Sequence, residues 1–236
     1  MRNSSVYCVN SRQKKGRKMY RYLFFDLDGT LTNPKEGITK CVQYALRHYG
    51  IEEPDLDKLE PFIGPPLIGS FMEFYGMTEE QARGAVVKYR ERFRTEGIFE
   101  NFVYEGIPQM LEELQKQGKK LVIASSKPEK FVRQILEKFQ LSSYFGEVVG
   151  ATMNETRTAK AEVIQEAFAR LHLTEADKPE ILMIGDRKHD VEGAAACGID
   201  CLGTTIGFAA PGELEAAGAA YVVNTVEEMR EFLQKH

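Results

Sequence analysis

The chain has 236 residues, a net charge of −4 and 43% hydrophobic residues, a composition typical of a globular protein. No stretch approaches the roughly 18 consecutive apolar residues that a membrane span needs, so we expect no membrane partner. Seven of the 31 basic residues lie within residues 1–21, which contain no acidic residue. The rest of the chain is therefore acidic, which argues against nucleic acid as a partner because phosphate backbones bind to basic surfaces.

The basic N-terminal segment, residues 1–18, lacks the apolar run of a secretory signal. We predict a disordered extension without a role in the chemistry. A transit peptide, a surface-seeking tail and an extension before a start at Met19 are the alternatives.

The cysteines form no Cys-x-x-Cys pair, and no histidine lies near them at zinc-ligand spacing. We predict reduced thiols, which favour a cytoplasmic location. The four residues are Cys8, Cys41, Cys197 and Cys201.

A short apolar run at residues 21–25 predicts a first strand, and roughly 75 residues without a convincing strand follow it. Those residues indicate helices, which are separated by prolines and glycines, at residues 38–49, 67–75 and 79–96. A connection of this length is too large for a loop. We therefore predict a helical domain, residues 33–103, inserted into a core formed by residues 19–32 and 104–236.

From residue 104 onward, short apolar runs alternate with amphipathic segments, the pattern of a parallel sheet covered by helices. The predicted fold class is α/β, with a doubly wound, Rossmann-like parallel sheet. In the strand order 3-2-1-4-5 of such sheets, the first strand lies between the second and the fourth. The later strands are expected at residues 121–124, 147–150, 181–184, 199–202 and 221–223.

Two carboxylates, Asp26 and Asp28, directly follow the first strand and precede Gly29. Ligands of open α/β sheets bind at this carboxyl end of the strands. Two close anions repel each other unless a cation lies between them, so the pair predicts a metal ion. Oxygen ligands favour Mg²⁺ over zinc or copper.

Three further motifs are predicted to meet Asp26 at the same sheet edge. The strand at residues 121–124 ends at Ser125, and Pro128 suits the first turn of a helix, whose N-terminus could hold a phosphate. The strand at residues 181–184 is followed by Asp186. Lys160, at the start of the helix after the third strand, could reach the same edge.

In this order the motifs resemble those of the haloacid dehalogenase superfamily of phosphohydrolases over nearly the whole chain from Met19. Asp26 to Thr30 resembles the first motif, Ser125 the second, Lys160 the third, and Gly185-Asp186 with Asp190 the fourth. The helical insert lies where that superfamily places its cap. The motifs look most like those of the phosphoglycolate-phosphatase-like branch.

The resemblance implies that Asp26 attacks phosphorus to form an aspartyl-phosphate, while Asp28 exchanges protons with the leaving group and with water. It also implies that Mg²⁺ is held by Asp26, by the backbone carbonyl of Asp28 and by Asp186. Asp190 would orient Lys160 or a water ligand of the metal.

The resemblance further implies that Ser125, Ser126, Lys160 and backbone amides near Leu27 hold the phosphate oxygens. In the insert, we predict that the rigid turn at Gly64 and Pro65 faces the site.

The expected activity is Mg²⁺-dependent hydrolysis of a small-metabolite phosphate monoester, of the phosphoglycolate or nucleoside 5′-monophosphate type. One alternative is a phosphomutase of the same superfamily, although Thr30 favours hydrolysis over that activity. A non-enzymatic phosphate-binding module is the other alternative, but such a module does not need Asp28. The sequence leaves the oligomeric state open.

Overall fold

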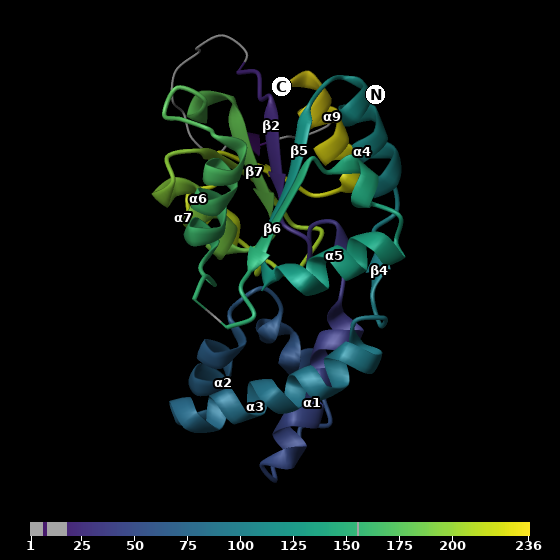
Figure 1. Ribbon diagram of the computed structural model, residues 1–236, viewed down its shortest axis with the longest axis vertical. Helices are drawn as coiled ribbons and strands as arrows, with labels where there is room; N and C mark the ends of the chain where they lie inside the picture. The colour runs from purple at the N-terminus through teal and green to yellow at the C-terminus, as the bar shows by residue number, and fades with distance from the viewer. Residues whose placement is uncertain (1–6, 9–17, 155) are drawn as a thin grey trace. The chain divides into compact units, whose positions relative to one another are not determined.

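The computed structural model describes residues 7–8, 18–154 and 156–236 (Figure 1). The chain divides into two compact units. One unit contains Val103–His236 and the described residues up to Leu31, and the other is Thr32–Phe102. Within the described part of the chain, every helix is too short or too polar to span a membrane.

The first unit is built on a seven-stranded sheet in the order β1-β9-β8-β7-β2-β5-β6. Six strands are parallel, which confirms the predicted α/β fold, and β2 lies between β5 and β7 as the strand order predicted. The parallel strands are β2 (Tyr22–Phe25), β5 (Lys120–Pro128), β6 (Glu147–Ala151), β7 (Ile181–Gly185), β8 (Asp200–Thr204) and β9 (Tyr221–Val223).

The seventh strand, β1 (Tyr7–Cys8), was not predicted; it pairs antiparallel with β9 at one edge of the sheet. It lies within the segment for which a disordered extension was predicted. Residues 1–6 and 9–17 of that segment lie outside the described residues.

Side chains alternate between the two faces of the sheet along each strand, and consecutive residues of the central strands are buried. Both faces are therefore apolar, and helices cover both of them. Phe24, Val122 and Met183 belong to the core cluster that also contains buried residues of α6 (Lys160–Leu171) and α7 (Lys188–Ala196). The view in Figure 1 places α6 and α7 on one side of the central strands and α4 and α9 on the other. The remaining elements of this unit are α4 (Ile107–Lys116), α5 (Glu129–Lys138), η3 (Ser142–Tyr144), η4 (Lys178–Glu180), α8 (Glu213–Ala216) and α9 (Val226–Lys235).

The second unit is helical, which confirms the predicted helical insertion. Thr78 caps the start of α3 (Glu79–Arg92): its hydroxyl accepts a hydrogen bond from the Gln81 amide, and the Gln81 side chain accepts one from the Thr78 amide. The 3-10 helix η1 (Leu56–Phe62) was not predicted, because Pro61 within it was expected to interrupt a helix. The elements are α1 (Lys35–His48), η1 (Leu56–Phe62), α2 (Leu67–Tyr75), α3 (Glu79–Arg92) and the π-helix η2 (Phe93–Gly97); β3 (Thr32–Asn33) and β4 (Phe102–Val103) pair where the chain enters and leaves the unit.

The strand β5 contains a bulge at the carboxyl end of the sheet. Ser125 pairs with Gly150 and Pro128 with Ala151, so two residues of β5 lie where β6 has none. Gly150 permits this close approach, because a Cβ atom there would lie 2.6 Å from the carbonyl oxygen of Lys127. The strand therefore continues past its predicted end at residue 124.

We expect Gly150→Ala to lower the free energy of unfolding by about 1–3 kcal/mol, because backbone atoms of Lys127 and Glu129 would have to move. Gly146→Ala is the matched control: a Cβ atom there would meet only the Leu121 carbonyl oxygen, at 4.0 Å. Urea unfolding of both variants tests this expectation. Equal stabilities would show that the bulge tolerates a side chain at position 150.

Glu213 connects the loops that follow β7 and β8. Its carboxylate accepts hydrogen bonds from the Lys188 amide at 2.8 Å and the Ala210 amide at 3.0 Å, and it pairs with Arg187. Burial disfavours the charged carboxylate, but these donors outweigh burial and lower the pKa of Glu213.

A carboxylate with a lowered pKa in the folded state stabilises the protein above its unfolded pKa, and this contribution disappears as the pH falls through the folded value. We therefore expect Glu213→Gln to cost about 1–2 kcal/mol at pH 7 and progressively less below about pH 4. Glu215→Gln, at an exposed position of the same helix, is the control. A penalty that did not change with pH would contradict the electrostatic explanation.

Candidate active site

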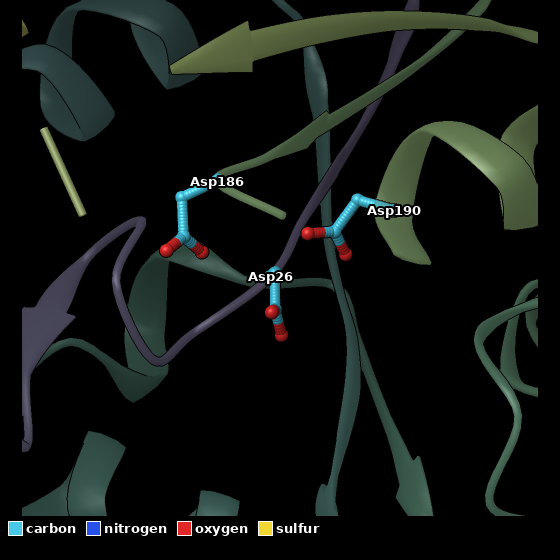
Figure 2. Close-up of side chains that lie close together, drawn as sticks. All are labelled: Asp26, Asp186 and Asp190. Atoms are coloured by element: carbon cyan, nitrogen blue, oxygen red, sulfur yellow. The ribbon is translucent and has the colours of Figure 1, made fainter. Parts of the chain in front are cut away.

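Three buried carboxylates meet at the carboxyl end of the sheet (Figure 2). Asp26 follows β2, and its amide donates a hydrogen bond of 2.9 Å to the carbonyl oxygen of Ile184 in β7. Asp186 follows β7, and Asp190 lies in the first turn of α7. One carboxylate oxygen from each of the three residues lies within 4.8 Å of the others.

Asp186 is held in a tightly packed turn. Its Oδ1 accepts a hydrogen bond from the Thr30 hydroxyl at 3.3 Å, and its Oδ2 accepts one from the Phe208 amide at 2.8 Å. A Cβ atom at Gly29 would lie 2.1 Å from Asp186 Oδ2, and one at Gly207 would lie 2.2 Å from the same oxygen. Gly29 also has a φ of +81°, which favours glycine. These contacts hold the carboxylate in one orientation.

Lys160, the first residue of α6, connects two of the carboxylates. Its Nζ lies 3.0 Å from Asp26 Oδ1 and 2.7 Å from Asp190 Oδ1, and it donates a hydrogen bond of 2.8 Å to the Ala124 carbonyl. Burial opposes the charged ammonium, but Asp190 and Asp26 outweigh burial and raise the pKa of Lys160. Lys160 is therefore a fixed positive charge beside Asp26.

Asp190 uses its two oxygens differently. Its Oδ2 accepts a hydrogen bond from the Arg187 amide at 3.1 Å, which caps the start of α7. Its Oδ1 faces Lys160. The predicted task of Asp190, to orient Lys160, matches this position but stays a prediction about function.

A second ion pair joins Lys127 to Asp28. Both side chains are nearly buried, with exposed fractions of 7% and 8%, and Lys127 Nζ bonds to Asp28 Oδ2. The Lys127 amide donates a hydrogen bond of 3.3 Å to the hydroxyl of Ser125, which is buried nearby. The sequence reasoning did not select Lys127. The alternation of a regular strand could not have identified it, because its position depends on the bulge in β5.

The other predicted site residues are placed as follows. Leu27 is buried, and its carbonyl accepts hydrogen bonds from the amides of Thr30 and Leu31 in the turn after β2. Ser126 is half-buried in the bulge. Gly64 and Pro65 are half-buried within the helical unit. The proposed contacts of these residues with a substrate stay predictions.

The charges at the sheet edge are unbalanced. Burial, and then the negative charges of Asp190 and Asp26, raise the pKa of Asp186 well above its usual value. Burial also raises the pKa of Asp28, against the opposing effect of Lys127. The cluster contains four carboxylates and two ammonium groups, which leaves two formal negative charges. One divalent cation would neutralise them.

The donor atoms suit such a cation. Oxygens Oδ1 of Asp26, Asp28 and Asp190 are buried and accept no hydrogen bond of ordinary geometry from the residues that the structure describes. Lys160 lies at ion-pair distance from those of Asp26 and Asp190. Buried polar atoms normally accept hydrogen bonds, so carboxylate oxygens that accept none indicate a further ligand. An all-oxygen donor set favours a hard cation such as Mg²⁺. Asp26, Asp186 and Asp190 could therefore hold a metal ion.

Known proteins are similar to this chain in sequence and in fold. The sequence profile of the haloacid dehalogenase-like hydrolases matches residues 23–204. A Pseudomonas aeruginosa protein named 5′-nucleotidase is 44% identical, over 92% of this chain and 97% of that protein. A Mycobacterium tuberculosis protein named tyrosine-protein kinase PtkA is 35% identical, over 89% of this chain and 72% of that protein.

The fold agrees with this relationship. The crystal structure of a predicted phosphatase from Clostridium acetobutylicum has a TM-score of 0.89 and 44% identity, and the match covers 92% of this chain and all of that one. A profile match over most of the chain, together with relatives of this identity and coverage, confirms the resemblance of the motifs. The chain belongs to the haloacid dehalogenase-like hydrolases and is a phosphatase of that family.

Proposed function

We propose that this chain is a Mg²⁺-dependent phosphatase that hydrolyses a nucleoside 5′-monophosphate, with phosphoglycolate as the other candidate substrate, through an aspartyl-phosphate on Asp26. The observation that carries the proposal is the pairing of two carboxylates with two separate lysines, Asp26 with Lys160 and Asp28 with Lys127. The relative named 5′-nucleotidase supports the nucleotide over phosphoglycolate.

In the first step, a carboxylate oxygen of Asp26 attacks phosphorus, and the bond from phosphorus to the leaving oxygen breaks. Asp28, in its protonated form, donates its proton to that oxygen, so the product leaves as a neutral alcohol. The raised pKa of Asp28 supports this role, because it keeps a proton available at higher pH. Lys160 holds Asp26 beside the reacting phosphorus.

In the second step, the carboxylate of Asp28 takes a proton from water, and the water oxygen attacks the phosphorus of the aspartyl-phosphate. The bond between phosphorus and Asp26 breaks, inorganic phosphate leaves, and both aspartates return to their starting forms. One residue thus acts as acid and then as base.

Other groups would hold the phosphate and the metal. The Ser125 hydroxyl, Ser126, Lys160 and the backbone near Leu27 would bind the phosphate oxygens. Asp26 and Asp186, with the backbone carbonyl of Asp28, would hold Mg²⁺, and Asp190 would orient Lys160. Bound Mg²⁺ would offset the repulsion between the Asp26 carboxylate and the phosphate dianion.

A second candidate function is transfer of the phosphoryl group to an acceptor other than water. It is favoured by the relative named tyrosine-protein kinase, and a phosphomutase belongs to the same class. Asp28 could deprotonate a hydroxyl group as well as water. Labelled phosphate that returns to an organic acceptor, instead of appearing as inorganic phosphate, would support this function over hydrolysis.

We expect Mg²⁺-dependent release of inorganic phosphate from one member of a panel of nucleoside 5′-monophosphates and phosphoglycolate. Asp26→Asn should lower turnover at least about 10³-fold, because the nearly isosteric amide cannot attack phosphorus. Asp177→Asn, at a half-buried carboxylate that accepts hydrogen bonds from Thr174 in the turn before β7, should leave turnover unchanged. Steady turnover by a clean Asp26→Asn preparation would rule out the covalent intermediate.

We expect Mg²⁺ to stabilise the protein without any substrate. At a free Mg²⁺ concentration of about 100 times the dissociation constant, the free energy of unfolding rises by about 2.7 kcal/mol. This corresponds to an increase of roughly 5–10 °C in the unfolding temperature. Asp186→Asn should abolish this shift and should not destabilise the metal-free protein, because it removes one buried negative charge. Asp177→Asn should keep the shift. An Asp186→Asn variant with an undiminished shift would place the metal elsewhere.

A further inference from the structure

We propose that Lys127 is a positioning residue that holds the side chain of Asp28 by one carboxylate oxygen, which leaves the other oxygen to exchange protons with the leaving group. This inference rests on the role proposed for Asp28. It assigns to Lys127 a function in the reaction that neither its sequence position nor the metal cluster indicated.

The two oxygens of Asp28 have different surroundings. Oδ2 bonds to the ammonium of Lys127. Oδ1 is buried and accepts no hydrogen bond from the described residues. Since a buried polar atom normally has a partner, Oδ1 is the oxygen that is available to a bound ligand. The carboxylate is therefore anchored on one side and open on the other.

The bulge in β5 provides the backbone position from which Lys127 reaches Asp28. Ser126 and Lys127 are the two residues of β5 that have no counterpart in β6. Bulges near active sites redirect side chains in this way. Gly150 lets the strands approach, and the bond from the Lys127 amide to the Ser125 hydroxyl ties the bulge to a predicted phosphate-binding residue.

An anchor is needed because Asp28 lies beyond the end of β2, at an isolated β-bridge rather than within a regular strand. A misplacement of about 1 Å can lower the rate of a positioned reaction about 100-fold. Burial of a lysine is also costly unless its charge is compensated. The nearly buried pair satisfies both requirements, since each charge compensates the other and Asp28 is held in place.

The competing explanation is that Lys127 contacts the phosphate itself. The two roles differ in how they depend on the leaving group. A p-nitrophenolate ion leaves without receiving a proton, whereas the alkoxide of a nucleotide or of glycolate needs one. A residue that acts through Asp28 affects only the second kind of ester, and a residue that binds phosphate affects both kinds equally.

The test compares kcat/KM for p-nitrophenyl phosphate with that for the best alkyl ester of the panel above. The variants are Lys127→Met, Lys127→Arg, Asp28→Asn and the double variant, with Lys130→Met at an exposed position as the matched control. The ratio kcat/KM reports the step in which the leaving group departs. Retained hydrolysis of p-nitrophenyl phosphate shows that a variant is folded.

We expect Lys127→Met to lower kcat/KM for the alkyl ester by about 10–100-fold and that for p-nitrophenyl phosphate by no more than about 3-fold. Lys127→Arg, which keeps the charge, should recover part of the loss. In the Asp28→Asn background, Lys127→Met should have no additional effect.

Equal losses for both esters, or a loss that persists undiminished in the Asp28→Asn background, would overturn the inference and assign Lys127 to the phosphate. A different result is expected if the proposed function is wrong and Asp28 does not protonate the leaving group. In that case Asp28→Asn alone would leave hydrolysis of the alkyl ester unchanged, whatever Lys127→Met does.

Discussion

The mutual repulsion of buried carboxylates at one sheet edge is the constraint on which the arrangement of the α/β unit depends. Asp26, Asp28, Asp186 and Asp190 are each at most 6% exposed. Such a group is stable only if opposite charges and hydrogen-bond donors come close to it. Lys160 at the start of α6, Lys127 in the bulge of β5 and the amide of Phe208 after β8 provide them. Three elements that are far apart in the sequence thus meet at one edge of the sheet, where each compensates the negative charge of the carboxylates.

The same constraint gives identical residue types different tasks. Asp26 lies beside Lys160 and belongs to the group of carboxylates that could hold a metal ion, surroundings that suit a nucleophile. Asp28 lies outside that group, and burial raises its pKa, surroundings that favour a group able to carry a proton. Two carboxylates two residues apart can therefore act as nucleophile and as acid without any difference in their own chemistry.

Much of this arrangement could be predicted from the sequence, because it follows from local patterns. Apolar runs predicted the six parallel strands, and the strand order placed Asp26, Ser125 and Asp186 at adjacent strand ends. Features that depend on distant contacts were missed. Lys127 reaches Asp28 only because β5 bulges against β6, and the amide that holds Asp186 comes from a loop 22 residues further along the chain. The edge strand β1 has only two residues, too few to form a periodic pattern.

The residues proposed to break and form bonds all belong to one of the two compact units. The carboxylates, the two lysines and Ser125 lie in the unit that contains the sheet, whereas Thr32–Phe102 is a separate helical unit. A phosphoryl group and its metal ion present the same oxygens and charges in every phosphate ester, so the groups that bind them need not change with the substrate. Substrates differ in the leaving group, which needs a proton from Asp28 and recognition by other side chains. The pair of Asp28 and Lys127 is thus the part of the catalytic unit whose importance depends on which ester is bound.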